Sequence, residues 1–434
     1  MMSTETPESP PASSLDQPEP IALTHPADGV PEVAVSAAQI DAAAALLAAG
    51  RGPFAVDAER ASGFRYSNRA YLIQIRRAGA GTVLIDPVGE GGDRVAALRP
   101  VAQVLGTDEW ILHAADQDLP CMAELGMRPP ALYDTELAGR LAGFDRVNLA
   151  TMVQRLLGLG LAKGHGAADW SRRPLPLDWL NYAALDVEVL IELRHEIAGV
   201  LHAQGKTDWA AQEFAHVRNV SAADPTMPTR RDRWRRTSGI HKVRDRRGLA
   251  AVRELWLVRD QIAQQRDIAP GRILPDSSII AAALTNPGSV EELVNLPVFG
   301  GPRQRRNART WLSALAAARD NPNPPEINEP YDGPPPPVRW SKRKPEAAAR
   351  LEAVRAALSS LAEQVAVPTE NLLAPELVRR LCWDWNPDPG CDEASRGAAV
   401  EAFLRAGRAR PWQCDLTVPI LAPALLAGAN PAAR

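Results

Sequence analysis

A short apolar run that ends in two alternate carboxylates constrains the fold of this chain more than any other stretch. Residues 54–56 (Phe-Ala-Val) predict a buried strand, and Asp57 and Glu59 follow it at positions i and i+2. Because alternate residues of a strand point to the same face, the two carboxylates are expected to lie side by side. Like charges held this close repel each other unless a cation lies between them. Taken alone, the pattern also fits a solvated strand end, so other residues of the chain are needed to choose between a cation site and a solvated strand end.

Length and charge limit the number of domains and the kind of surface that this chain can have. The 434 residues are enough for about two to four domains with hydrophobic cores, and 45% apolar residues with 23% charged residues is a globular composition. The net charge of −3 excludes a uniformly basic nucleic-acid binder. Any phosphate-binding surface therefore has to be a local patch.

The cysteines and the N-terminal region predict a cytoplasmic location. Cys121, Cys382, Cys391 and Cys414 are too scattered for a disulfide framework and form no C-x-x-C pair, so we expect reduced thiols and no structural zinc site. No Lys or Arg precedes Arg51, as a signal peptide would require, and no apolar run reaches the ~18 residues of a membrane span. The sequence thus predicts a soluble protein without a membrane partner.

Strand and helix signals alternate over the first half of the chain. We predict strands near residues 54–59, 71–75, 82–86 and 110–113, and helices over 37–49, 93–106, 149–158 and 177–197, with further helices beginning near 117 and after 134–135. This order indicates a mixed α/β sheet flanked by helices. Helical periodicity alone dominates the second half.

Composition marks two linkers in the second half of the chain. Nine Lys and Arg residues outnumber two Asp residues over 230–247, and the run Pro334–Pro337 indicates an extended polyproline segment. Between and after them, Ala251-Val252-Arg253 recurs as Ala353-Val354-Arg355, a weak internal repeat. The expected organisation is a disordered tail over residues 1–32, an α/β domain over 33–220, a basic linker over 221–247, a helical domain over 248–320, a Pro-rich linker over 321–345 and a second helical domain over 346–434.

Three further side chains carry chemistry when they are taken with Asp57 and Glu59. Asp118 lies just past the fourth predicted strand, where it also fits a helix N-cap. Tyr182 and Asp186 are four residues apart in a helical stretch, so the phenol and the carboxylate share one helix face.

Four carboxylates can converge only around cations. Two hard divalent ions about 3.5–4 Å apart would neutralise them and would suit the attack of water on a phosphodiester. The expected metal ligands are therefore Asp57, Glu59, Asp118 and Asp186. Tyr182 would orient the attacking water or help to deprotonate it.

These motifs resemble the DEDDy 3′–5′ exonuclease superfamily, and within it the ribonuclease D family. The resemblance covers about residues 33–215 and is carried by Asp57-Ala58-Glu59, by Asp118 after His113-Ala114, by Tyr182-x-x-x-Asp186, and by the stretches 71–75, Asp134-Thr135, Asp169-Trp170 and Arg173-Pro174-Leu175. It implies an RNase H-like α/β exonuclease domain that uses Mg²⁺ or Mn²⁺. It also implies that Asp57, Glu59 and Asp186 hold the nucleophile-side metal, while Asp57 bridges to a second metal supported by Asp118.

The first helical region resembles the HRDC domain, a small nucleic-acid-binding module shared by RecQ helicases and ribonuclease D. Residues 255–263 and 266–276 carry that resemblance. The last region resembles the more divergent second HRDC-like domain of ribonuclease D, on the weak repeat and on residues 409–413 (Ala-Arg-Pro-Trp-Gln). No G-x-x-x-x-G-K-[ST] occurs in the chain, which excludes a helicase motor.

Four more residues are assigned to substrate binding, each with a structural alternative. Gln74 lies in a stretch that resembles the family, and His113 also fits a hydrogen-bonding residue at a strand end. Lys163 lies in a Gly-rich loop that also fits a solvated loop, and Trp170 also fits a packing residue. The basic stretch 230–247 and a cluster of four arginines over 303–309 are candidate phosphate-contacting surfaces.

We interpret the chain as a two-metal 3′–5′ exoribonuclease that releases nucleoside 5′-monophosphates from single-stranded RNA 3′ ends. The resemblance suggests tRNA precursors as substrates, and a monomer is the expected state. Two alternatives stay open. One is a DNA exonuclease of the same superfamily, because the sequence does not show how the ribose 2′-OH is read. The other is a non-catalytic RNA-binding scaffold, against which the intact carboxylate set argues.

Overall fold

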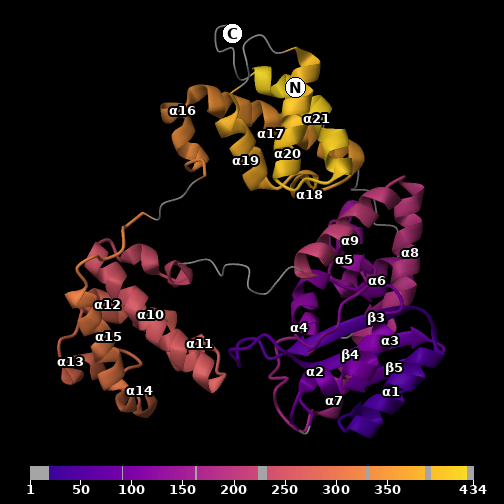
Figure 1. Cartoon of the computed structure of the whole chain (residues 1–434), viewed down its shortest axis with the longest axis horizontal. Coiled ribbons are helices and arrows are strands. Elements are labelled where there is room, and N and C mark those ends of the chain that lie inside the picture. Colours follow the sequence, from indigo (N-terminus) through magenta and orange to yellow (C-terminus); the bar gives the residue numbers. More distant parts are fainter. Residues whose placement is uncertain are drawn as a thin grey trace, which may run out of the picture.

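One α/β unit and two helical units make up the chain (Figure 1). The computed structural model describes residues 19–89, 91–161, 164–222, 232–328, 333–386 and 392–427. The α/β unit spans residues 19–222, the first helical unit 232–320 and the second helical unit 337–427. Each unit has its own cluster of buried apolar side chains, and the cluster of the α/β unit extends into the second helical unit.

Within the described residues, the α/β unit contains eight strands and the helices that pack around them. Its strands are β1 (Ile21–Leu23), β2 (Val33–Ala34), β3 (Arg51–Arg60), β4 (Ala70–Ala78), β5 (Gly81–Ile85), β6 (Trp110–Leu112), β7 (Leu132–Asp134) and β8 (Leu159–Leu161). Its helices are α1 (Ala37–Ala49), α2 (Arg94–Ala97), α3 (Arg99–Leu105), η1 (Ala115–Gln117), α4 (Leu119–Ala123), α5 (Thr135–Leu141), α6 (Leu149–Leu157), α7 (Leu177–Glu188), α8 (Leu190–Ala203) and α9 (Thr207–Ala222).

Six strands form one mixed sheet in the order β2-β5-β4-β3-β6-β7. β4 pairs antiparallel with β3 and β5, whereas β2, β6 and β7 join by parallel pairing. The fold class expected from the sequence is confirmed. The predicted strands are all present, and the short strands β1, β2, β7 and β8 are additional, because strands of two or three residues give only a weak periodic signal.

The two faces of the sheet have different roles. Residues 54, 56 and 58 of β3 join the main core together with α1 and α3. Residues on the opposite face alternate with them and include Asp57 and Glu59, which stand opposite Gln74 and Leu72 of β4. Helix α7 covers this second face, so the face that carries the carboxylates is also the face on which Asp186 arrives.

The disordered tail predicted for residues 1–32 is wrong at its C-terminal end. Ile21–Leu23 forms β1 and pairs in parallel with β8, while residues 1–18 lie outside the described residues. Ile21 remains 73% exposed and only Leu23 packs against the core, so the backbone pairing with β8 contributes much of the order of this segment. An argument from apolar composition does not detect that kind of order.

Both predicted linkers are shorter than their composition suggested. Trp234 and Val243 are buried in the core of the first helical unit, so residues 232–247 belong to that unit, and Arg230 and Arg231 lie outside the described residues. Trp340 is fully buried in the core of the second helical unit, which therefore begins before residue 345. A few apolar anchors outweigh the charged and proline-rich residues around them.

The two helical units share the same opening succession of helices. The first contains η2 (Arg233–Arg236), η3 (Ile240–Lys242), α10 (Arg246–Arg266), α11 (Pro270–Ile273), α12 (Asp276–Thr285), α13 (Val290–Val294), α14 (Pro302–Arg306) and α15 (Ala308–Asp320). The second contains η4 (Pro337–Arg339), α16 (Trp340–Arg343), α17 (Pro345–Val365), α18 (Thr369–Leu372), α19 (Pro375–Asp384), α20 (Glu393–Ala406) and α21 (Pro411–Ala427). A 21-residue helix, a left-handed cap at Asp267 or Ala366, a four-residue helix and a ten-residue helix follow one another in both. That the second unit is an HRDC-like domain stays a prediction.

The first helical unit is tied to the loop that leaves the carboxylate-bearing strand. Asp267, the cap of α10, accepts hydrogen bonds from the Ser67 backbone N–H at 2.9 Å and from Arg69 at 3.1 Å. The Ala269 backbone N–H donates to the Phe64 carbonyl at 3.0 Å. Because residues 61–69 directly follow β3, these bonds anchor the first helical unit next to Glu59.

The second helical unit docks on α9 through a buried polar contact and an aromatic stack. Trp209 and Trp412 stack with ring centroids 5.0 Å apart. The carboxylate of Glu213, which is 6% exposed, accepts hydrogen bonds from Arg410 at 2.6 Å and from the Trp412 indole N–H at 2.8 Å. None of the helices in the described part of the chain has the length and apolarity that a membrane crossing requires.

We predict that Glu213→Ala lowers the free energy of unfolding by about 1–3 kcal/mol, because it leaves a buried indole N–H and a guanidinium without their acceptor. Urea unfolding would measure this. The matched control is Glu401→Ala, which removes an exposed partner of Arg405 one helical turn away and should change stability by less than about 0.5 kcal/mol. Equal stability of the two variants would contradict the docking role of Glu213.

Candidate active site

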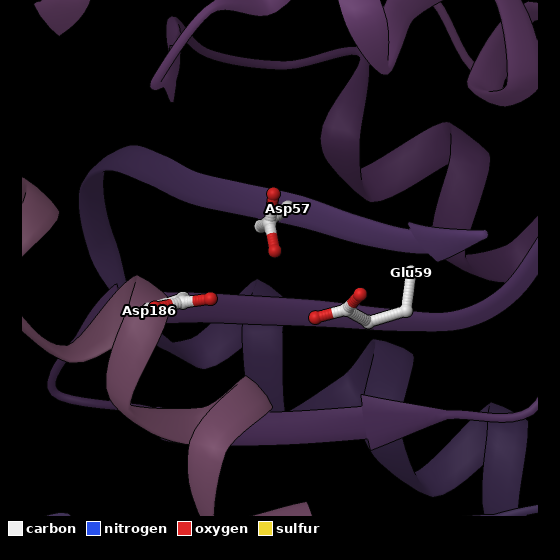
Figure 2. Close-up of side chains that lie close together, drawn as sticks. All are labelled: Asp57, Glu59 and Asp186. Atoms are coloured by element: carbon white, nitrogen blue, oxygen red, sulfur yellow. The ribbon is translucent and has the colours of Figure 1, made fainter. Parts of the chain in front are cut away.

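Three carboxylates converge on the sheet face beneath α7. Asp57 and Glu59 come from β3 and Asp186 from α7, and one oxygen of each lies within 4.8 Å of the others. Figure 2 shows the three side chains pointing from two strand positions and one helix position into a common space. The alternation predicted for Asp57 and Glu59 therefore produces the shared face, and α7 closes it.

Small residues allow α7 to approach the sheet closely. Ala183 and Ala184 are fully buried and pack in one cluster with Leu72 and Leu84 of the sheet. Side chains this short leave room for the helix backbone near the strands, as close packing of the interior requires. Asp186, two residues further on, is thereby carried to the carboxylates of β3.

Gln74 holds a carboxylate of the cluster in position. Its side chain is fully buried, and its Nε2 atom donates a 2.6 Å hydrogen bond to Oδ2 of Asp57, directly across from it in the sheet. The assignment of Gln74 to substrate binding stays a prediction, and the structure gives this side chain no exposed surface. Its effect on the site is to hold Asp57 in one orientation.

Asp118 reaches the site through a tight turn after β6. The backbone of Ala114 adopts a left-handed conformation (φ 60°), and the buried Asp134 accepts hydrogen bonds from the backbone N–H groups of Ala114 and Ala115 at 3.2 and 2.9 Å. This turn brings the Asp118 carboxyl close to that of Asp57. Asp118 does not belong to the group formed by Asp57, Glu59 and Asp186. Asp57 is the member of that group beside which it lies.

Burial and mutual repulsion make the charged forms of these groups unfavourable. The pKa of Glu59 is raised well above its usual value by burial and then by the charges of Asp57, Asp186 and Asp118. Burial first, and the charge of Asp57 second, likewise raise the pKa values of Asp118 and Asp186. Arg60 is the nearby positive charge that opposes the rise at Asp57, Glu59 and Asp118.

The residues present fit a divalent cation. Three carboxylates supply the oxygen ligands that hard cations such as Mg²⁺ and Mn²⁺ prefer, and their oxygens are already grouped. A bound cation would remove the repulsion that raises the pKa values of Glu59 and Asp186. Asp57, Glu59 and Asp186 can hold one ion. Asp118 lies beside Asp57, outside this group of three.

Tyr182 lies one turn before Asp186, with its hydroxyl near the carboxylate of that residue. Burial, and then the charges of Asp186 and Glu59, raise the pKa of its hydroxyl above the usual value, so the phenol keeps its proton. The backbone of Gly164 lies against the ring, where a Cβ atom would collide with ring carbons of Tyr182. Only glycine allows this contact, which confines the ring on one side.

Two adjoining cavities meet at Tyr182. One, of 330 Å³, is lined by Asp57, His113, Asn148, Tyr182 and Asp186. The other, of 440 Å³, is lined by Thr24, His25 and Asn181 and shares Gly164, Tyr182 and Asp186 with the first. Both volumes fall in the range of about 300–1,000 Å³ that is typical of ligand sites.

The remaining substrate candidates fall into three cases. His113 lines the 330 Å³ cavity, and its Nδ1 atom lies 2.9 Å from Oγ1 of Thr135, a strand-end hydrogen bond. Trp170 is fully buried beside Trp179, where its ring fills the core under α7, so the structure shows the packing role, and its assignment to substrate stays a prediction. Lys163 lies outside the described residues.

Sequence reasoning overlooked Arg60, Asp134, Asn148 and Gly164 as residues that shape the site. The sequence places Asp134 before a helix and in a stretch that resembles the family, and Gly164 in a Gly-rich loop, without indicating what either residue holds in place. A signal for Arg60 was available, since a cation directly after Glu59 is the nearest countercharge in the sequence. The contact of Gly164 with Tyr182 is made across 18 residues of sequence and has no local signal.

The fold and the grouped carboxylates define a nuclease of the 3′–5′ exonuclease class. A family model described as 3′–5′ exonuclease matches residues 33–202, which include all four carboxylates and Tyr182. An HRDC domain model matches residues 248–315, and a model described as 3′ to 5′ exonuclease C-terminal domain matches residues 333–425.

Relatives narrow the class to one family. Ribonuclease D of Gluconacetobacter diazotrophicus is 31% identical over 313 residues, which are 70% of this chain and 75% of that protein. Ribonuclease D of Shewanella sp. is 30% identical over 283 residues, 64% of this chain and 69% of the relative. The chain belongs to the ribonuclease D family.

Solved structures resemble the whole chain. A protein from Bifidobacterium adolescentis is 37% identical, with a TM-score of 0.82 over 94% of this chain and all of the other. RNase D of Escherichia coli, described as an exoribonuclease involved in structured RNA processing, shares the fold at 22% identity, with a TM-score of 0.64 over 91% of this chain and 98% of the other.

We predict that Gly164→Ala slows the exonuclease reaction by about 10–100-fold, because the added Cβ displaces the ring of Tyr182 from its position beside Asp186. Single-turnover cleavage would measure the effect. Gly166→Ala is the matched control, since its Cβ would lie at an ordinary 3.7 Å from the Tyr182 hydroxyl. In a Tyr182→Ala background the Gly164→Ala change should cost nothing further, and a full additional loss there would contradict the explanation.

His113 is expected to make the folded protein sensitive to mild acid. Burial lowers the pKa of its imidazole to about 4, so the folded state keeps it neutral while the unfolded chain protonates it near its usual 6.5. Its contribution to stability is complete above pH 6.5 and is lost as the pH falls toward 4, by about 3 kcal/mol at most. Unfolding free energies of wild type and His113→Asn, measured from pH 7 to 4 in a chelator, should therefore diverge in this window. Parallel curves would contradict the assignment.

Proposed function

We propose that this protein is a metal-dependent 3′–5′ exoribonuclease that shortens single-stranded RNA from the 3′ end and releases nucleoside 5′-monophosphates. The observation that carries the proposal is the group of Asp57, Glu59 and Asp186, whose oxygens lie within 4.8 Å of one another beside a cavity that Tyr182 lines. RNA is the substrate by which the ribonuclease D relatives are named.

In this proposal two divalent ions, Mg²⁺ or Mn²⁺, occupy the carboxylates. Asp57, Glu59 and Asp186 hold one, and Asp57 with Asp118 holds the second. When bound, such ions acidify the attacking water and stabilise the leaving 3′ oxygen. Gln74 keeps Asp57 in the orientation that both positions need.

Tyr182 orients the attacking water and does not act as its base. The support is the raised pKa of its hydroxyl, which follows from burial and the neighbouring carboxylates. A protonated phenol can hold a water molecule by a hydrogen bond but cannot accept its proton. The two cavities that share Tyr182 offer room for the nucleotides on either side of the scissile bond.

The helical units hold the RNA upstream of the cleaved bond. Arg303, Arg305, Arg306 and Arg309 are exposed on α14 and the start of α15, where they can contact phosphates without reading sequence. We extend the proposal to tRNA precursors as substrates, to a monomer as the active state and to the cytoplasm as its location. The buried free thiols of Cys121, Cys382 and Cys414 are compatible with that compartment.

The test of this function uses 5′-labelled single-stranded RNA and DNA with Mg²⁺ or Mn²⁺. We expect a ladder that shortens from the 3′ end of the RNA with wild type and no products with Asp57→Asn, which removes the ligand common to both metal positions. Asp116→Asn, an exposed carboxylate two residues from Asp118, is the matched control and should stay active.

Other outcomes identify the alternatives. Faster degradation of DNA would make this a DNA exonuclease with the same site. Binding of RNA without cleavage under any metal condition would support a non-catalytic scaffold. Trimming of a tRNA precursor but not of an unstructured RNA would narrow the substrate class.

Tyr182→Phe should leave RNA binding intact and slow cleavage by about 10²–10⁴-fold, the usual size of a lost acid–base or positioning group. Because a neutral phenol only orients water, the rate of the wild type should show no titration that the variant lacks. Single-turnover rates across pH 6–9 would reveal this. An unchanged rate in Tyr182→Phe would remove the hydroxyl from the mechanism.

A further inference from the structure

Arg60 points to the carboxylate cluster although strict strand alternation would turn it away. Asp57 and Glu59 share one face of β3, and the next residue should face the opposite side. The pairing of β3 with β4 is irregular between Glu59 and Arg60: Glu59 pairs with Leu72 and Arg60 with Ala70, so Tyr71 is passed over. Irregularities of this kind re-aim side chains next to functional sites.

The guanidinium of Arg60 lies between two acceptors of the following loop. Its Nη2 atom is 3.5 Å from Oδ1 of Asp118 and 3.4 Å from Oε1 of Gln117. Charge-assisted hydrogen bonds are usually about 2.7–2.9 Å long, so both contacts are loose. The side chain is 25% exposed, so part of it is accessible to a ligand.

Arg60 also has a special place in the charge balance of the site. Asp118 lies beside Asp57 but outside the group formed by Asp57, Glu59 and Asp186. Arg60 supplies the positive charge that balances the Asp118 carboxylate. A cation bound at Asp57 and Asp118 would take over that role and would be repelled by the guanidinium. A phosphate, by contrast, matches the planar fork of an arginine and binds it in two places.

We propose that Arg60 is an exchangeable countercharge: it pairs with Asp118 in the free enzyme and moves to a backbone phosphate of the RNA when the cation and substrate bind. This inference rests on the proposed function, whose site it deepens. Arg60 then opposes binding of a divalent ion at Asp118 in the absence of RNA and adds affinity for RNA in its presence. Metal occupancy of that position thereby depends on the substrate.

The test exploits the opposite signs of these two effects in Arg60→Gln. Without RNA, the concentration of Mn²⁺ that half-saturates the rise in unfolding temperature should fall about three- to ten-fold, because a repelling charge is gone. With RNA, KM should rise about ten-fold or more while kcat changes by less than about three-fold, because a phosphate contact is lost. A purely structural role of Arg60 would worsen both quantities together.

Two further variants complete the design. Arg51→Gln removes the same charge from the exposed end of the same strand and should leave both quantities at their wild-type values. Arg60→Lys keeps the charge but lacks the planar fork, so it should restore the Mn²⁺ response while KM recovers only in part. Weaker Mn²⁺ binding in Arg60→Gln, or an unchanged KM, would overturn the proposal.

Failure of this inference can be told apart from failure of the proposed function. If wild type cleaves RNA and Asp57→Asn does not, the exonuclease stands whatever Arg60→Gln does. If wild type cleaves nothing, the function fails, and the phosphate role of Arg60 fails with it.

Discussion

Mutual repulsion between buried carboxylates is the constraint on which this structure depends. Asp57, Glu59 and Asp186 are grouped within 4.8 Å, and Asp118 lies beside Asp57, although burial raises the pKa of each and neighbouring like charges add to the rise at Glu59, Asp118 and Asp186. Such an arrangement costs folding free energy unless a cation or a counter-residue compensates it. The irregular strand end at Glu59–Arg60 provides one partial compensation, since it turns a guanidinium toward Asp118. A divalent cation would provide the rest.

The scaffold around the cluster keeps these charges together by packing and backbone geometry. Ala183 and Ala184 allow α7 to lie close to the sheet, and Gln74 fixes Asp57 from across the strand pair. Asp134 holds the left-handed turn that delivers Asp118, and Gly164 confines Tyr182. None of these residues needs to contact substrate, yet each positions one of the carboxylates or the Tyr182 ring. This division between ligands and their supports is the usual one in metal-dependent sites.

The helical units are placed by a few buried polar contacts. Asp267 and Ala269 tie the first unit to the loop that directly follows β3. Glu213 and the stack of Trp209 on Trp412 tie the second unit to α9. Both units open with the same succession of helices, but each is attached to the α/β unit by different contacts. The first attachment starts at the carboxylate-bearing strand, so that unit is fixed beside the site.

The sequence alone determined the parts of this protein that depend on local periodicity and fixed spacing. Alternation along one strand predicted that Asp57 and Glu59 share a face, and the i, i+4 spacing in a helix predicted the pairing of Tyr182 with Asp186. Both predictions need only backbone geometry, and so does the mixed α/β sheet. Only the tertiary structure decided that Gln74 and Trp170 are buried and that residues 21–23 form a strand. It also decided that Trp234 and Trp340 anchor segments read as linkers, and that Arg60 turns toward Asp118. Those outcomes depend on what lies across the sheet or in another unit, and contacts between residues far apart in the chain leave no periodic signal in the sequence.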